Sequence, residues 1–119
     1  MPHIIVEYAK PLKKIILTTE FKTNLIKNLI SYSNFHPNNI KYRSIQYSDY
    51  FSACSQAFIY LTIKILPGRT QEQKINISES NLKYFKEKIL INKKFKKKYI
   101  EFTIQIEELD SKTYKKLIY

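Results

Sequence analysis

Several residue types are scarce in this 119-residue sequence, and each shortage excludes a class of protein. A single glycine excludes a glycine-rich phosphate-binding loop. A single cysteine, Cys54, excludes an internal disulfide framework and a cysteine-rich zinc site. Because such a chain does not need an oxidising compartment, we expect it to be cytoplasmic.

Long apolar stretches are also missing. The longest uncharged apolar stretch, residues 58–63, is far too short to span a bilayer. The chain start lacks the basic region of a signal peptide, and Glu7 interrupts the apolar run that follows. With 44% hydrophobic and 26% charged residues, the composition is that of an ordinary globular domain. We therefore expect one domain over residues 1–119 and no membrane partner.

Acidic residues are outnumbered, 10 against 21 basic ones, which gives a net charge of +11. Such a charge attracts nucleic acids and other anions. Only Arg43 and Arg69 are arginines, however, and the abundant lysine can follow from A/T-rich codon usage. The two arginines carry more information, because lysine cannot imitate their planar, bidentate fork.

The densest basic run is residues 93–98. It would attract a phosphate backbone, or it is a solvated connector that protects the strand after it from aggregation. We favour the connector and do not expect a nucleic-acid partner, because no recognised nucleic-acid motif accompanies the run.

Hydrophobic periodicity predicts a strand–helix–strand pattern that occurs twice, in halves of about 1–56 and 57–119. We expect strands at 3–8, 40–47, 58–66 and 99–108, helices at 19–32 and 71–91, and a short helical turn in the tail 110–119. The inward face of the second helix is predicted to consist of Ile75, Leu82, Phe85, Ile89 and Leu90. The fold class is α+β: tandem β-α-β units form a four-stranded sheet with two helices on one face. The other face would stay uncovered, which favours an oligomer.

The amino terminus holds the first candidate site. Methionine before a small residue is normally removed, which would leave Pro2 with a free secondary amine. An ordinary α-amino group has a pKa of about 7.7–8.0, and a prolyl amine is more basic. Nearby cations and an apolar pocket would lower the pKa and leave a neutral general base. The alternative is that Pro2 merely begins the chain.

The turn at residues 67–70 combines two local signals. Gly68, the only glycine, suits a backbone with positive φ. Thr70 and Gln73 have the spacing of a capping box, which begins a helix. Arg69 lies between them, beside a helix N-terminus that adds positive potential.

The two arginines form the second candidate site. Lys41 and Arg43 occupy alternate positions of a predicted strand and therefore share one face. Two guanidinium groups around one pocket, Arg43 and Arg69, would suit a dicarboxylate. The alternative is that both arginines are surface salt-bridge partners. His3 and His36 lack a carboxylate pattern for a metal, so we expect no metal site.

Several motifs together resemble one known family. They are MPHIIVEY at residues 1–8, NIKYR at 39–43, FIYLTIKIL followed by PGRT at 58–70, the strand ending EEL at 101–109, and Thr113 with Tyr114. In this order they resemble the 5-carboxymethyl-2-hydroxymuconate isomerase family of the tautomerase superfamily. The resemblance spans nearly the whole chain.

The resemblance implies a homotrimer and a cofactor-free keto–enol isomerase of aromatic-compound catabolism. Pro2 would be the catalytic base, and Arg69 with Lys41, Arg43 or both would bind a carboxylated dienol, a small-molecule substrate. The family's loop after the second strand carries glycines, whereas residues 51–56 read FSACSQ. A different carboxylated enol substrate is therefore one alternative. A non-enzymatic basic binding module on the same scaffold is the other.

Overall fold

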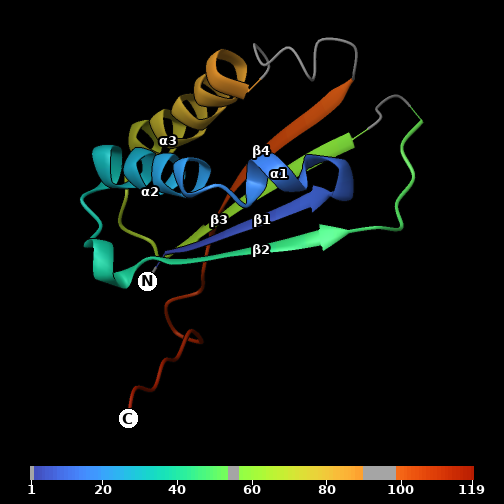
Figure 1. Cartoon of the computed structure of the whole chain (residues 1–119). Helices are drawn as coiled ribbons and strands as arrows, with labels where there is room; N and C mark the ends of the chain where they lie inside the picture. Colours follow the sequence, from blue (N-terminus) through green and yellow to red (C-terminus); the bar gives the residue numbers. More distant parts are fainter. Residues whose placement is uncertain (1, 54–56, 90–98) are drawn as a thin grey trace.

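The computed structural model describes residues 2–53, 57–89 and 99–119, in which the strand–helix–strand order occurs twice (Figure 1). The first half contains β1 (His3–Ala9), the 3₁₀ turn η1 (Lys10–Leu12), α1 (Lys13–Ile16), α2 (Thr19–Ser33), the 3₁₀ turn η2 (Pro37–Asn39) and β2 (Lys41–Tyr47). The second half contains β3 (Ala57–Ile65), α3 (Gln71–Tyr84), the π-helical turn η3 (Phe85–Ile89) and β4 (Ile100–Glu108). Each strand lies within one residue of its predicted bounds.

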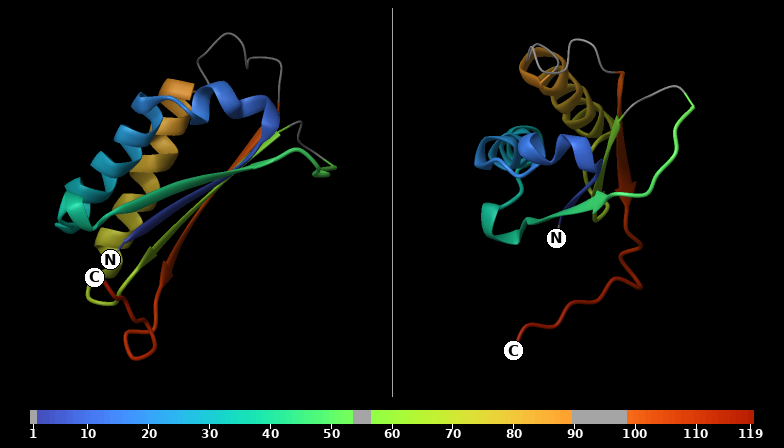
Figure 2. Two further views of the ribbon diagram at one scale, coloured as in Figure 1. Left: turned by 60° about the horizontal axis from the view of Figure 1, so that its bottom comes forward. Right: turned by 45° about the vertical axis from the view of Figure 1, so that its right-hand side comes forward.

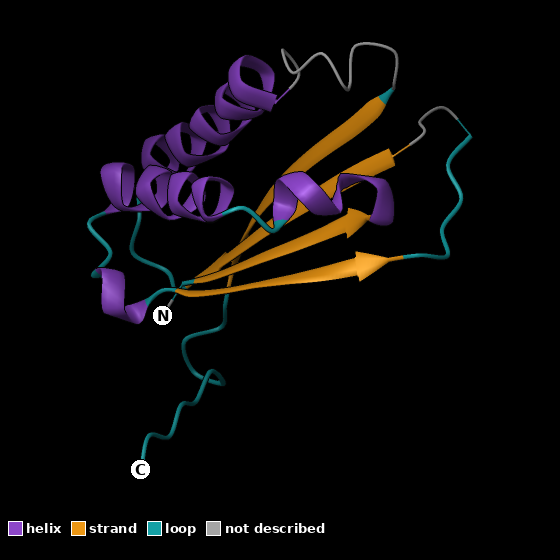
Figure 3. Cartoon of the chain, viewed as in Figure 1, coloured by secondary structure: helices purple, strands orange, loops and turns teal. Residues whose placement is uncertain are grey.

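The strands form a sheet of order β2-β1-β3-β4. β1 pairs parallel with β2 and antiparallel with β3, and β3 pairs parallel with β4. Both long helices, α2 and α3, lie on the same face of this sheet, as the turned views show (Figure 2). The predicted α+β class and the tandem β-α-β arrangement are therefore confirmed, and the two layers are plain when the chain is coloured by secondary structure (Figure 3).

The core lies between the sheet and its two helices. On β1 the side chains of Ile4 and Val6 are completely buried, because alternate residues of the strand face the helices. α2 adds Phe21, Leu25 and Leu29, which are spaced by four residues and share one helix face. In the described part of the chain, no helix is both long and apolar enough to cross a bilayer.

The prediction for the inward face of α3 is wrong at two positions. Ile75 is 46% exposed and Leu82 is 38% exposed, whereas Ile77 is completely buried. At about 100° per residue, both lie roughly 140–160° around the helix from Ile77. The predicted Phe85 and Ile89 are buried, and Leu90 lies outside the described residues.

Asn81 takes the core position that the pattern assigned to a leucine. Its side chain is completely buried, and both halves of its amide have a partner. Nδ2 donates to the Ile77 carbonyl at 2.9 Å, and Oδ1 accepts from Nδ2 of Asn28 on α2 at 3.0 Å. These bonds offset the cost of burying a polar group, so α3 can turn its polar asparagine inward.

The segment after β1 was predicted only as a break in the pattern. It forms the short helical elements η1 and α1 instead, which bury Leu12 and Ile16. These two residues belong to the core, and they close the end of the layer that lies against β1.

The turn that leads into α3 has the predicted geometry. Gly68 has φ +129°, a conformation that side-chain-bearing residues rarely adopt. Thr70 accepts a hydrogen bond from the Gln73 N–H, and the Gln73 side chain accepts one from the Thr70 N–H, which completes the capping box. Arg69 is therefore held between two fixed neighbours.

Candidate functional site

Pro2 lies directly before β1, and its side chain is buried. Its carbonyl accepts a hydrogen bond from the Lys41 N–H at 3.0 Å, which ties the chain start to β2. On the other side, the register pairs His3 with Lys64, so Pro2 lies beside the end of β3. Pro2 is therefore fixed between two strands and does not extend into bulk water.

Arg69 is held by groups from the end of α2. Its Cζ lies 3.6 Å from the centroid of the Phe35 ring, and its Nε donates to the Ser33 carbonyl at 3.3 Å. That carbonyl belongs to the last residue of α2, where the helix dipole favours a cation. Among the described residues the Nη groups have no hydrogen-bond partner, so the end of the guanidinium fork is free to bind a ligand oxygen.

The platform under Arg69 depends on the way α2 ends. Asn34 has φ +55°, a left-handed conformation that asparagine tolerates and that ends the helix. The reversal turns Phe35 back into the core, where it is 7% exposed. The ring face can then contact the guanidinium, a geometry that favours a cation.

Arg43 lies on the other face of the sheet. It is exposed, and its Nη1 lies 3.1 Å from Nδ1 of His3. Nε2 of His3 lies 3.0 Å from the Tyr114 hydroxyl, and the two rings meet edge to face. Lys41 is also exposed and pairs in register with His3, so both predicted basic residues of β2 lie beside the first residue of β1.

The electrostatics of this region are cationic. Partial burial lowers the pKa of His3 below its ordinary value of 6.5, and the charges of Arg43, Lys64 and Lys116 lower it further. Glu107 on β4 offsets part of this charge, since its carboxylate lies 3.9 Å from the Lys64 ammonium. The surroundings of the chain start therefore favour anions.

The two arginines do not meet within one chain. Arg69 contacts α2 and Phe35 in the helix layer, whereas Arg43 contacts His3 on the open face. Neither arginine forms an ion pair with a carboxylate of the described residues, which speaks against the salt-bridge alternative. A pocket that contains both guanidinium groups stays a prediction.

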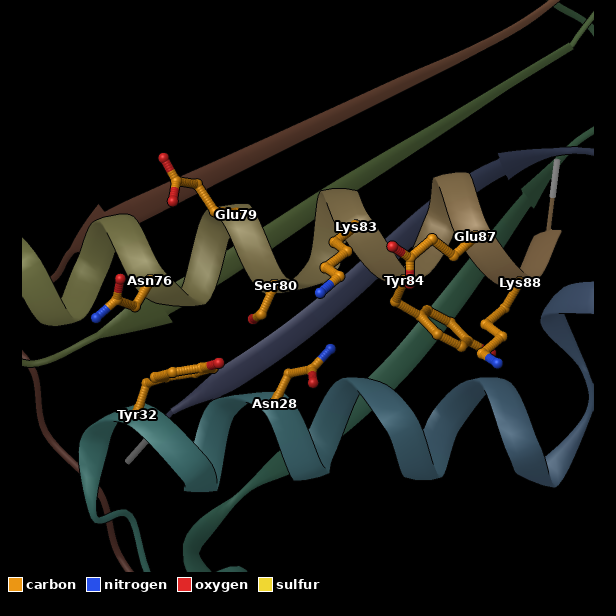
Figure 4. A pocket seen from close by; sticks show the side chains of 9 residues that line it. All are labelled: Asn28, Tyr32, Asn76, Glu79, Ser80, Lys83, Tyr84, Glu87 and Lys88. Carbon is orange, nitrogen blue, oxygen red and sulfur yellow. The ribbon is translucent and has the colours of Figure 1, made fainter.

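Three hollows of about 400 Å³ each lie elsewhere on the molecule. One is a groove between α2 and α3 with both signs of charge on its rim, from Lys83, Lys88, Glu79 and Glu87 (Figure 4). The second lies on the open sheet face, and the third lies beside α3 and β4. None of these three hollows is lined by a predicted site residue.

No local sequence pattern marks the residues that hold the arginines. Ser33 and Phe35 were not singled out, and Tyr114 was noted only as part of a resemblance. His3 belongs to the MPHIIVEY motif, and no sequence pattern predicts its contacts with Arg43 and Tyr114. Among the described residues no group of three or more His, Cys, Asp or Glu could hold a metal ion. The Cys54 side chain and the basic run 93–98 lie outside the described residues.

Comparisons with known proteins give one family and one fold. The model of a family described as 5-carboxymethyl-2-hydroxymuconate isomerase matches residues 2–117. No curated protein matches the sequence.

Among solved structures, the chain is similar to a 5-carboxymethyl-2-hydroxymuconate isomerase from Deinococcus radiodurans R1, with 21% identity over 98% of this chain and 88% of that one and a TM-score of 0.69. It is also similar to a 5-carboxymethyl-2-hydroxymuconate delta-isomerase, with 14% identity over 100% and 89% and a TM-score of 0.79. A fused 4-OT symmetric trimer is 15% identical over 94% and 91%, with a TM-score of 0.62. At these identities the structural likenesses show the fold.

Proposed function

The chain belongs to the 5-carboxymethyl-2-hydroxymuconate isomerase family, and on this premise we propose that it uses Pro2 as the general base of a cofactor-independent keto–enol isomerisation. Membership makes the chain an isomerase of the tautomerase type. The proposed substrate is a carboxylated dienol such as 5-carboxymethyl-2-hydroxymuconate. The observation that carries the proposal is the burial of Pro2 at the start of β1, next to a cationic surface.

Removal of Met1 would give Pro2 a free secondary amine. Burial disfavours the protonated form of an amine, and so do nearby cations. Both are present, since Pro2 is buried and Lys41, Arg43 and Lys64 lie around the first residue of β1. These surroundings support a prolyl nitrogen that is neutral near physiological pH.

The proposed reaction moves one proton within the substrate. The substrate as a whole is neither oxidised nor reduced. Neutral Pro2 takes the proton of the enol hydroxyl of a dienol or, from an unsaturated ketone, the proton of an allylic carbon, and a dienolate forms in either case. Arg69, with Arg43 or Lys41, holds the carboxylates and stabilises the developing negative charge. The prolinium then returns the proton to a different carbon, which gives the unsaturated ketone. Acid–base assistance of this kind contributes about 10²–10⁴-fold to the rate.

A homotrimer is part of the proposal. The open sheet face carries exposed apolar side chains, including Ile45 and Tyr47 on the edge strand β2. A similar fold occurs in a 4-OT symmetric trimer. Because Arg43 and Arg69 of one chain lie on opposite faces, we propose that a neighbouring copy completes a pocket that uses both.

The test compares two forms of the protein in an assay of dienol ketonisation. One form has Met1 removed, as verified by intact mass. The other has a short N-terminal extension, which turns the Pro2 nitrogen into an amide without basicity. We expect turnover only in the first form, with a loss of at least about 10²-fold in the second. Equal turnover of the two forms would contradict the role of Pro2.

The rival from another class, a basic binding module, predicts a different outcome. Changing Lys96, Lys97 and Lys98 together to Gln removes three of the five lysines of the basic run 93–98. The change touches no proposed site residue. We expect the isomerisation rate of this variant to stay nearly unchanged. A large loss would favour a function of the anion-attracting surface.

A further inference from the structure

His3 is held between two side chains from distant parts of the chain. Arg43 Nη1 lies 3.1 Å from His3 Nδ1, and the Tyr114 hydroxyl lies 3.0 Å from Nε2. A guanidinium has only N–H donors and does not lose its proton in proteins. Nδ1 must therefore accept the hydrogen bond, and the proton of the neutral imidazole lies on Nε2. The Nε2–H then donates to the oxygen of Tyr114.

Backbone hydrogen bonds hold the C-terminal segment where Tyr114 can contact His3. Immediately after β4, the Leu109 N–H donates to the Ile65 carbonyl at 2.7 Å. The Asp110 carbonyl accepts from the Tyr114 N–H at 2.9 Å and closes a turn. This turn, predicted for the tail, brings the Tyr114 ring to 6.1 Å from the His3 ring, with 73° between the ring planes.

We propose that His3 is a positioning residue of the isomerase: as the Nε2–H tautomer, fixed by Tyr114, it holds the Arg43 guanidinium on the open sheet face at the start of β1. This inference rests on the proposed function, in which Arg43 binds a substrate carboxylate. Arg43 is exposed, and an exposed arginine loses rotamer freedom when it binds a ligand. A bond that orders Arg43 beforehand reduces this cost and improves substrate binding.

The charges around His3 maintain the neutral form. Arg43 approaches from β2, Lys64 from β3, and Lys116 from the C-terminal segment. Lys41, also on β2, is its register partner. A protonated imidazole would present an N–H to the N–H of Arg43, and the bond would be lost. Acid should therefore release Arg43 and weaken binding of the substrate.

The first test measures the tautomer directly, without any substrate. Long-range ¹H–¹⁵N spectra at neutral pH distinguish the two ring nitrogens of His3, and His36, the other histidine of the chain, is assigned through a His36→Asn variant. We expect an unprotonated Nδ1 and a protonated Nε2, with a shift of the Nε2 signal in Tyr114→Phe. A proton on Nδ1, or a cationic ring, would overturn the proposal.

The second test separates positioning from a merely structural role. We expect His3→Ala to raise KM about tenfold with little change in kcat, the size of one lost charge-assisted hydrogen bond. His3→Asn keeps an acceptor near the Nδ1 position and should restore most of the affinity. In an Arg43→Ala background His3→Ala should have no further effect on KM, because the bond is already absent.

Two kinetic outcomes would overturn the proposal. One is an unchanged KM in His3→Ala. The other is a full additional tenfold effect in the double variant, because independent effects show that His3 does not act through Arg43. If the wild type isomerises no carboxylated dienol, the proposed function fails, whereas the NMR measurement still decides whether His3 holds Arg43.

Discussion

Arg43 and Arg69 carry the same charge, but the molecule holds them in different ways. Arg69 is half-buried, with an aromatic ring against its guanidinium and a helix-terminal carbonyl on its Nε. Arg43 is exposed, and its partner is an imidazole. The Phe35 ring and the Ser33 carbonyl carry no titratable proton, whereas the His3 imidazole can be protonated in acid, with a pKa that burial and Arg43 lower from 6.5.

In the proposed site, this difference would make Arg69 an anion-binding group at every pH and Arg43 one that depends on the protonation of His3. The helix dipole and the Phe35 ring act on Arg69 at every pH at which the protein is folded. The bond to Arg43 exists only while His3 is neutral. Changes at Arg69 should therefore have the larger effects, and changes at Arg43 should depend on pH.

The largest effect is expected for Arg69→Lys, which keeps the charge but removes the planar fork. We expect kcat/KM for the dienol to fall about 100-fold, since two charge-assisted bonds to a carboxylate become one. Arg43→Lys, the matched control on the other face, should lose about tenfold. Equal activity of Arg69→Lys and the wild type would remove Arg69 from the site.

Phe35→Leu tests the ring under Arg69. We expect the free energy of unfolding to fall by about 1–2 kcal/mol, because a buried ring and its cation–π contact are lost, and KM to rise. Phe102→Leu is the control: it removes a ring that stacks on Phe85, with centroids 4.4 Å apart. That variant should lose stability in urea unfolding but keep its KM. A similar rise in KM in both variants would show that KM responds to the loss of any core ring and not to the contact between Phe35 and Arg69.

Tyr42→Phe tests whether the two faces of β2 are independent. Among the described residues, the buried Tyr42 hydroxyl has no hydrogen-bond partner. Burial raises the pKa of Tyr42 to about 12, with a smaller effect of Tyr8. Removing an unpaired hydroxyl should increase the free energy of unfolding by up to about 1 kcal/mol. KM should not change, because Arg43 is on the opposite face. A lower stability would indicate that the hydroxyl has a partner.

The smallest effect is the contribution of His3 to stability. Its pKa in the folded chain is lowered from 6.5, first by burial and then by Arg43. The neutral form is thus favoured by folding, so this contribution is complete above pH 6.5 and is lost as the pH falls through the folded pKa. Urea unfolding at pH 7.5 and pH 5 should show a larger loss for the wild type than for His3→Asn. Equal losses would contradict the assigned direction.

Much of the fold could be predicted because its signals are local. β4 alternates strictly, so the sequence separates Phe102 and Ile104 from Glu101 and Gln105, and the register confirms the two faces. The capping box at Thr70 is read from two residues. The inward face of α3 could not be read in this way, because the partner of Asn81 is Asn28, 53 residues away.

The candidate site also contains residues that local sequence signals predict and residues that only the tertiary structure reveals. Pro2, Arg43 and Arg69 were selected because of their own chemistry and their place in a predicted element. Their partners were missed because tertiary structure brings them together: Ser33 is 36 residues from Arg69, and Tyr114 is 111 residues from His3. No periodicity or capping rule operates over such separations.

The most direct test of the central claim is the rate at which Pro2→Ala converts a 2-hydroxymuconate-like dienol to its ketone. The account predicts a fall in kcat of about 10²–10⁴-fold relative to the methionine-free wild type, with the fold retained by circular dichroism. An unchanged rate would show that the base is another group and would contradict the account.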